Sequence, residues 1–175
     1  MKRRTGVLNM YSTFAWIEAT ALSVWLRESP SLWSFPFVLI LHTVGMGFLA
    51  GTNVAMDLRV VGFAPKVPLS LFEKFFLVMK ISFVVNAASG ILLLIAYPTK
   101  ALTNPLFYIK LLLIAVGLIE AVWLRSHVLR NPLTDVKGPS TKGKVMAVAS
   151  LATWAGAVGA GRFLAYTYAH LLAGG

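Results

Sequence analysis

The sequence predicts an all-α fold, an integral membrane four-helix bundle with an N-terminal amphipathic helix at the membrane interface. The chain is 58% hydrophobic and only 13% charged, whereas an ordinary soluble domain is roughly 45–50% apolar. Its mean hydropathy is +0.76. It also contains four long apolar runs, and about 20 such residues suffice to cross a hydrocarbon layer about 30 Å thick. These three observations predict a membrane protein with four spans.

Residues 1–30 form the first predicted unit, an interfacial amphipathic segment. The stretch TFAWIEATALSVWLRES places apolar residues from Phe14 to Trp25 near helical spacing, while Glu18 and Arg27 interrupt them. The segment is too short and too polar to span, so we expect it to lie in the interface. A cleaved signal peptide is the alternative, but polar residues break its apolar core and no small-residue cleavage site follows.

Residues 31–175 form the second predicted unit, the bundle itself. Prolines mark the start of the first span, and the polar stretches YPTKALTNP and RNPLTDVKGPSTKGK separate the second, third and fourth spans. Aromatic residues at the predicted ends favour the boundary between water and lipid. The predicted spans cover 33–56, 75–97, 105–124 and 145–168.

Basic residues predict the orientation. Four spans return the chain to the side on which it begins, which we call side A, and the opposite side is side B. The positive-inside rule favours side B as cytoplasmic and both termini outside, although the MKRR start argues the other way. Side B loops carry Arg59, Lys66, Lys74, Arg125, Arg130, Lys137, Lys142 and Lys144, and side A carries Lys2, Arg3, Arg4, Arg27 and Lys100.

Composition also narrows the partners and the chemistry. The formal net charge is +10, but the cations lie in loops beside the membrane, where they meet anionic lipid head groups. We therefore expect membrane lipid, and no nucleic acid, as a partner. The chain has no cysteine, which excludes thiol chemistry. It also has no phosphate-binding Gly-Lys-Ser/Thr loop and no His-Glu-x-x-His motif.

Polar groups within the spans are the candidate functional residues, because an unpaired ionisable group in a membrane is costly and needs a partner or a function. At about 1.5 Å of helix rise per residue, three of them fall in the side A half. Lys80 and Glu120 fall in the side B half, where they are able to pair. The full set is His42, Lys80, Asn86, Lys110, Glu120, Arg162 and, at the end of the fourth span, His170.

The convergence of His42, Lys110 and Arg162 at one depth predicts a site for haem b. Imidazole is a common axial ligand of haem iron, and cationic side chains neutralise the propionates. Lys110 is a candidate second ligand or propionate partner, and Arg162 a partner of a propionate or a quinone head group. His170 is a second candidate metal ligand with His42, and a site with one axial ligand or no cofactor stays open.

Three glycines are predicted to let a flat macrocycle approach the helices. They are Gly45 and Gly47 in the first span and Gly159 in the fourth. Taken alone, the same glycines favour close packing of helices with no cofactor.

The stretch MDLRVVG predicts the end of the first spanning helix. Asp57 and Arg59 are expected to anchor this end on side B, and Gly62 to close it. A docking surface for a partner is the alternative.

The stretches LHTVGMGFLAGTNVAMDLRVVG, NPLFYIK and WAGAVGAGRFLAY resemble a family of small bacterial inner-membrane proteins of uncharacterised function. That family has a His-x-x-Gly first span that ends in an Asp-Leu-Arg-x-x-Gly turn. The order of elements is also distantly similar to HemJ-type protoporphyrinogen oxidases and CopD-like membrane proteins. The resemblance implies a bacterial inner-membrane location and a haem b site at His42 and Lys110, whereas the context of Lys and Trp around the HemJ-type histidine is missing here.

Two functions follow as expectations. The first is a cytochrome-like oxidoreductase component that carries electrons on haem b between the quinone pool and a partner at the outer face. The second is a cofactor-free accessory or anchor subunit of a larger membrane complex. Partner subunits or a homo-oligomer fit either function.

Overall fold

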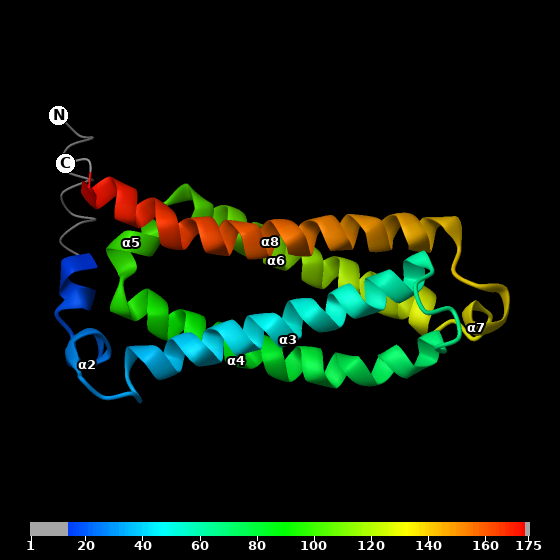
Figure 1. The fold of residues 1–175 in the computed structure, drawn as a ribbon, viewed down its shortest axis with the longest axis horizontal. Helices are drawn as coiled ribbons and strands as arrows, with labels where there is room; N and C mark the ends of the chain where they lie inside the picture. The colour runs from blue at the N-terminus through cyan, green and yellow to red at the C-terminus, as the bar shows by residue number, and fades with distance from the viewer. Residues whose placement is uncertain (1–13, 174–175) are drawn as a thin grey trace.

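A computed structural model gives the fold of the chain (Figure 1) and describes residues 14–173, except for the side chains of 165 and 168–173. The described residues contain helices and no strand, which confirms the all-α prediction. The elements are α2 (Ala21–Glu28), α3 (Phe35–Val61), η1 (Leu69–Lys74), α4 (Phe75–Ala96), α5 (Pro98–Leu102), α6 (Pro105–Leu124), η2 (Arg125–Leu129), α7 (Thr134–Lys137) and α8 (Thr141–Ala173).

Within residues 14–173, four helical segments are long and apolar enough to cross a membrane, as many as the sequence predicts. α3 continues to Val61, beyond the predicted end at residue 56, and stops where Gly62 adopts a φ of +130°. The Gly62 amide donates to the Leu58 carbonyl and closes the last turn. The segments are Phe35–Val61, Leu69–Ala96, Pro105–Leu129 and Thr141–Leu164.

The long helices pack as two pairs. α3 packs along α4, α6 packs along α8, and α3 also packs along α8, which joins the pairs into one bundle (Figure 1). α2 and the C-terminal part of α8 lie at one end of the bundle, and α7 lies at the other (Figure 1). These ends correspond to side A and side B of the sequence prediction.

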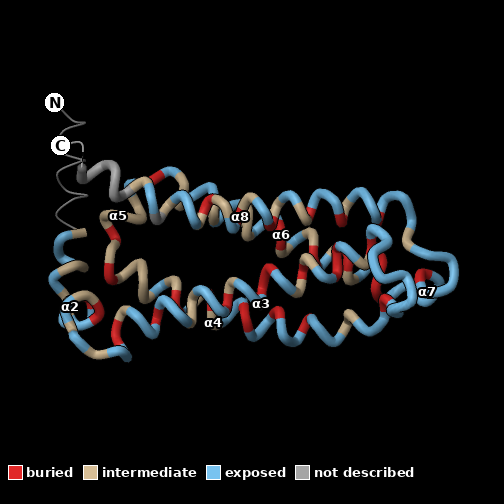
Figure 2. Tube along the Cα trace, in the orientation of Figure 1, coloured by how far each residue is buried: buried red, intermediate tan, exposed pale blue. Residues whose placement is uncertain are grey.

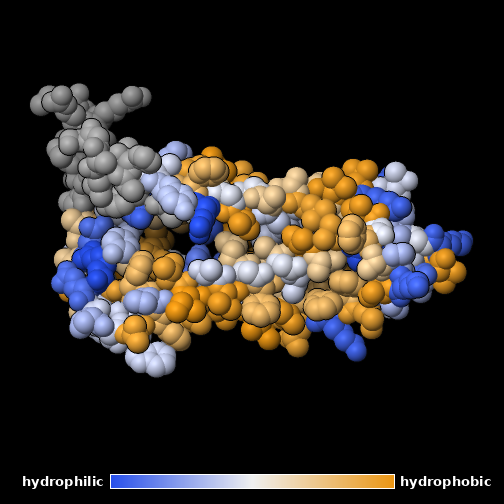
Figure 3. Space-filling model, viewed as in Figure 1, coloured by the Kyte–Doolittle hydropathy of each residue, from blue (hydrophilic) through white to orange (hydrophobic). Residues whose placement is uncertain are grey.

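The surface of the bundle is apolar between two polar ends (Figure 3). Buried residues line the inner faces of the helices, and the outer faces are exposed (Figure 2). Large apolar side chains such as Ile81, Val84, Leu112 and Ile119 are 57–69% exposed. Four apolar helices with such outer faces suit contact with membrane lipid.

The buried apolar residues form two clusters of unequal size. The larger one fills the half of the bundle toward α7 and includes Leu49, Val60, Leu124 and Trp154. The smaller one, at the α2 end, joins Leu26, Val38 and Ala96. The bundle is therefore most closely packed toward side B.

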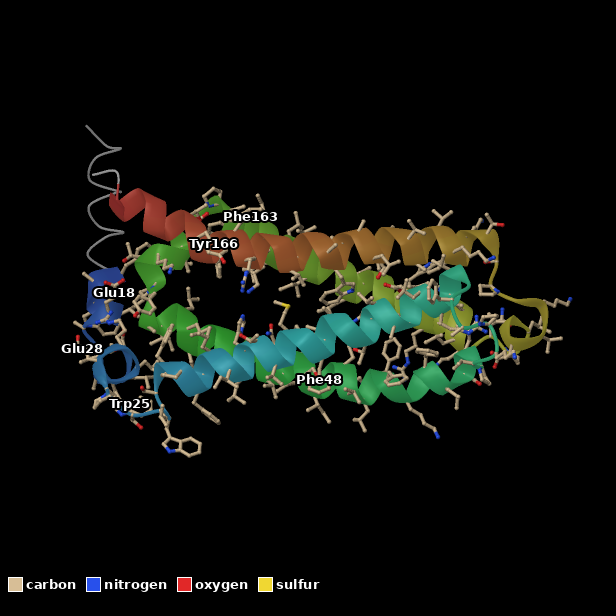
Figure 4. All side chains as sticks on the ribbon, viewed as in Figure 1. Glu18, Trp25, Glu28, Phe48, Phe163 and Tyr166 are labelled. Atoms are coloured by element: carbon tan, nitrogen blue, oxygen red, sulfur yellow. The ribbon has the colours of Figure 1, made fainter. Side chains whose placement is uncertain are left out.

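The N-terminal segment is helical but broken, which differs from the single amphipathic helix that the sequence predicts. A short helical segment, residues 14–18, precedes α2. The chain breaks between the two at Thr20, whose side-chain oxygen accepts from the Ser23 amide and caps α2. α2 then fastens to the end of α4, where Ser23 Oγ donates to the Ile95 carbonyl at 2.9 Å. Glu18, Trp25 and Glu28 lie at this end of the molecule (Figure 4).

Charged residues at the side B end hold its loops in place. Glu73 pairs with both Arg125 and Arg130, and Arg125 also lies 4.5 Å above the ring of Phe76. Arg59 donates to the backbone carbonyls of residues 65 and 67. The cations that predict the orientation therefore also tie the segments between spans together.

Asp135 of α7 predicts a pH-dependent contribution to stability. Its Oδ1 accepts from the Leu69 amide at 2.7 Å and so caps the start of η1. Burial alone would raise the pKa of Asp135, but hydrogen bonds from the Ser70 hydroxyl and from the Leu69 and Ser70 amides outweigh it and lower the pKa. The stabilisation is therefore complete above the ordinary carboxyl pKa of about 4 and disappears as pH falls through the lowered value.

We expect Asp135→Asn to destabilise the protein at neutral pH by less than about 1 kcal/mol, because this side chain is exposed. Thermal unfolding in detergent at a series of pH values measures the effect. The difference between variant and wild type should vanish in acid. A difference that stays constant with pH would contradict the assignment.

Candidate functional site

His42 of α3 is held by α4 through its Nδ1 atom. Nδ1 lies 3.1 Å from the Asn86 carbonyl oxygen and 3.2 Å from Ser89 Oγ. Because a carbonyl oxygen only accepts, we assign the proton to Nδ1, which donates to Asn86. The lone pair of the neutral imidazole is then on Nε2, the nitrogen that faces away from α4.

Lys110 of α6 meets that second nitrogen. Its Nζ lies 3.3 Å from His42 Nε2, and the ammonium donates to the imidazole lone pair. Both side chains are half-buried. The lysine stem lies along α8, since a Cβ built on Gly161 would stand 3.6 Å from Lys110 Cε. This contact therefore runs between the two helix pairs.

The α4 sequence Asn86-Ala-Ala-Ser-Gly forms the surface of α4 that contacts the imidazole. Asn86 Nδ2 donates to the His42 carbonyl at 2.8 Å, and Ser89 lies one turn further along. A Cβ built on Gly90 would stand 3.1 Å from His42 Cε1. Ser89 and Gly90 are not among the residues that the sequence predicts, although their spacing from Asn86 places all three on one face of α4.

The three predicted glycines differ in their surroundings. A Cβ on Gly45 would stand 3.1 Å from the Asn86 backbone nitrogen, so Gly45 allows α3 and α4 to approach closely. Nothing lies within 4 Å of a Cβ built on Gly47 or Gly159. Close helix packing therefore explains Gly45, and no described contact explains the other two.

Arg162 has no described hydrogen bond or ion pair with His42 or Lys110. The Arg162 side chain is exposed, and its guanidinium lies 5.7 Å above the ring of Tyr166, which is labelled with Phe163 on α8 in Figure 4. His170 belongs to the helix α8, but its side chain lies outside the described residues. His127, at the opposite end, is exposed and stacks on Trp123.

The surface is hollowed between α8 and the α3–α4 pair, toward α5 (Figure 3). Among the described residues no group of three or more His, Cys, Asp or Glu side chains is placed to hold a metal ion. An axial ligand of haem iron needs one suitably held imidazole, because the porphyrin supplies the other nitrogens. His42 fits that requirement in its tautomer and in its hydrogen bond to Asn86.

The predicted pair of Lys80 and Glu120 does not form in the structure. Lys80 is exposed on α4, whereas Oε2 of Glu120 is buried and has no hydrogen-bond partner among the described residues. Glu120 instead lies close enough to Asp57 of α3 for their charges to interact. Asp57, placed by the sequence at a helix end, is fully buried because α3 continues past it.

Comparison with models of protein families, with curated proteins and with solved structures finds no match for this chain.

Proposed function

We propose that the chain is a b-type haem-binding protein of the bacterial cytoplasmic membrane, with both termini outside. It would carry electrons between the quinone pool and a partner at the outer face. The observation that carries the proposal is the hydrogen bond from His42 Nδ1 to the Asn86 carbonyl. That bond leaves the lone pair on Nε2, inside an apolar bundle, where Lys110 now donates to it and where haem iron would take the place of that hydrogen bond.

The surroundings of His42 support its role as an axial ligand. A metal-ligating histidine almost always donates its other ring nitrogen to a carbonyl or carboxylate, which fixes the ring and raises its basicity. The Asn86 carbonyl is such an acceptor, and Gly90 closes off one side of the ring. The hydrogen bond from His42 Nδ1 to the Asn86 carbonyl is therefore the supporting contact that a metal-ligating histidine usually has.

Lys110 supports the proposal from the other helix pair. Lys110 Nζ is 3.3 Å from His42 Nε2, so the two side chains, one from each helix pair, would hold the haem between them, with Lys110 bound through its neutral amine. We assign Lys110 as the second ligand and the exposed Arg162 as a partner for a propionate or a quinone head group.

The haem would supply one-electron chemistry, and the chain would tune it. The Asn86 hydrogen bond and the apolar helices around His42 would set the redox potential of the haem. The resemblance to HemJ-type and CopD-like proteins belongs to the same proposal, since it matches the same two residues, His42 and Lys110.

A reduced-minus-oxidised absorption spectrum of the detergent-purified protein, with a pyridine haemochrome assay for stoichiometry, tests the proposal. We expect a b-type spectrum in the wild type and complete loss of haem in His42→Ala. His127→Ala is the matched control, because it removes an exposed histidine at the opposite end of the bundle and should leave the spectrum unchanged.

Full haem occupancy in His42→Ala would contradict the proposal. A colourless wild type, purified from cells with adequate haem supply, would contradict it as well. Copurification of such a colourless protein with other subunits would favour the accessory or anchor function instead.

A further inference from the structure

A second polar cluster lies inside the bundle, on helices α3, α6 and α8. Its members are buried polar atoms that have no hydrogen-bond partner among the described residues. Asp57 and Ser150 are 0% exposed, and Asn53 and Trp154 are 1% exposed. The atoms of this carboxyl cluster are Asn53 Oδ1, Asp57 Oδ1 and Oδ2, Glu120 Oε2, Ser150 Oγ and Trp154 Nε1.

The three helices bring these groups together. Ser150 and Trp154 are four residues apart and so share one face of α8. The Ser150 hydroxyl lies beside the Asp57 carboxyl without a well-aligned hydrogen bond, and Glu120 is near enough to Asp57 for their charges to interact. The Trp154 ring lies against Gly117, one turn before Glu120 on α6.

No basic side chain neutralises the two carboxyls within the described part of the chain. Both oxygens of Asp57 and the buried oxygen of Glu120 have no hydrogen-bond partner there. An ionised carboxylate without a partner is costly inside a membrane, and a second negative charge nearby adds to that cost. The nearby cations are engaged or exposed elsewhere: Arg59 on loop carbonyls, Arg125 on Glu73, and Lys80 and Lys144 on the surface.

Donors and acceptors in the carboxyl cluster also do not balance. With both carboxyls ionised, the cluster has four buried acceptor oxygens, one on Asn53, two on Asp57 and one on Glu120. It has only two hydrogen-bond donors, the Ser150 hydroxyl and the Trp154 indole N–H. A proton on a carboxyl oxygen removes one charge and adds one donor. One proton therefore brings the donors and acceptors into balance and leaves a single negative charge on the pair.

We propose that Asp57 and Glu120 form an intramembrane proton-binding site that holds one proton between them at neutral pH. A carboxylate oxygen forms an O–H bond with a proton taken from water, and no electron is transferred. Asp57 lies four residues before the end of α3 at Val61, about 6 Å along the helix axis. Glu120 is half-buried, so it is the member of the pair with access to the surface of the bundle.

A proton fits this cluster better than a metal cation does. Hard cations take six or more oxygen ligands or keep several waters, and the buried acceptor oxygens of the carboxyl cluster are fewer. The packing around them is also close, since Ala121 is 0% exposed and Trp154 is 1% exposed.

Infrared spectroscopy of the reconstituted protein tests the site through the carbonyl stretch of protonated carboxylic acids, identified by its shift in D₂O. At pH 7 we expect one protonated carboxyl per chain in the wild type. The double variant Asp57→Asn with Glu120→Gln should lose this band completely. Asp135→Asn is the matched control, because it makes the same change in an exposed acid and should leave the band intact.

The wild-type measurement keeps the proposal testable if the double variant does not fold. Absence of a protonated carboxyl in the wild type at pH 7 would overturn it. Survival of the band in a folded double variant would overturn it as well. So would loss of the wild-type band on addition of sodium or potassium chloride, since the site would then bind a metal cation.

Discussion

Trp154→Ala is expected to destabilise the bundle by about 3–5 kcal/mol, the usual cost of truncating a buried tryptophan. Trp154 is 1% exposed and is the largest fully buried side chain described. Its ring fills the space where α8 meets α6, against Gly117, and belongs to the main apolar cluster. An alanine would leave a cavity there that the close packing of α3, α6 and α8 cannot fill.

Unfolding by SDS titration in mixed micelles, followed by circular dichroism, measures this effect. Trp33→Ala is the matched control, because Trp33 is 70% exposed and its loss should change stability by no more than about 0.5 kcal/mol. Equal effects of the two changes would show that Trp154 is not a core residue.

A double-mutant cycle with Gly117→Ala sharpens the test. A Cβ at Gly117 would stand 2.9 Å from Trp154 Cε2, so the alanine should destabilise the wild type. It should cost much less in the Trp154→Ala background, because the two positions are in direct contact. Additive effects would place the tryptophan away from Gly117.

Gly90→Val is expected to weaken haem binding by about 10- to 100-fold, the usual effect of disturbing a residue that supports a metal ligand. A Cβ at Gly90 would lie 3.1 Å from His42 Cε1 and 3.5 Å from Nδ1. The branched valine must therefore push the imidazole off the Asn86 carbonyl. Absorbance titration of the haem-free protein with haem measures the affinity, and circular dichroism verifies that the variant is folded.

Gly51→Val provides the comparison for this variant, since it makes the same change in α3, nine residues from His42, where nothing lies within 4 Å of the added Cβ. Its haem affinity should equal that of the wild type. If both variants bind haem equally well, the contacts of the imidazole with α4 are not needed for haem binding.

The number and approximate limits of the spans could be predicted because length and apolarity alone decide whether a helix crosses a membrane. The end of α3 is harder to predict from the sequence, because it depends on the positive φ of Gly62 and not on hydropathy. Asp57 was consequently placed at a boundary, although the continued helix carries it into the bundle.

The contact between His42 and Lys110 follows from depth, which can be counted along a sequence. The contribution of Ser89 and Gly90 depends instead on which face of α4 turns toward α3. A helix that is apolar on every side has no periodic pattern to reveal that rotation. The absence of an ion pair between Lys80 and Glu120 has the same cause, since depth alone does not show which way either side chain points.

The acceptor that fixes the His42 tautomer is a main-chain carbonyl, and this has an evolutionary consequence. Every amino acid carries that oxygen, so mutation at position 86 leaves the acceptor atom in place. Selection on the Asn86 side chain acts instead through its own bond to the His42 carbonyl. Drift at this position would therefore loosen the fit between two helices before it changed which ring nitrogen carries the proton.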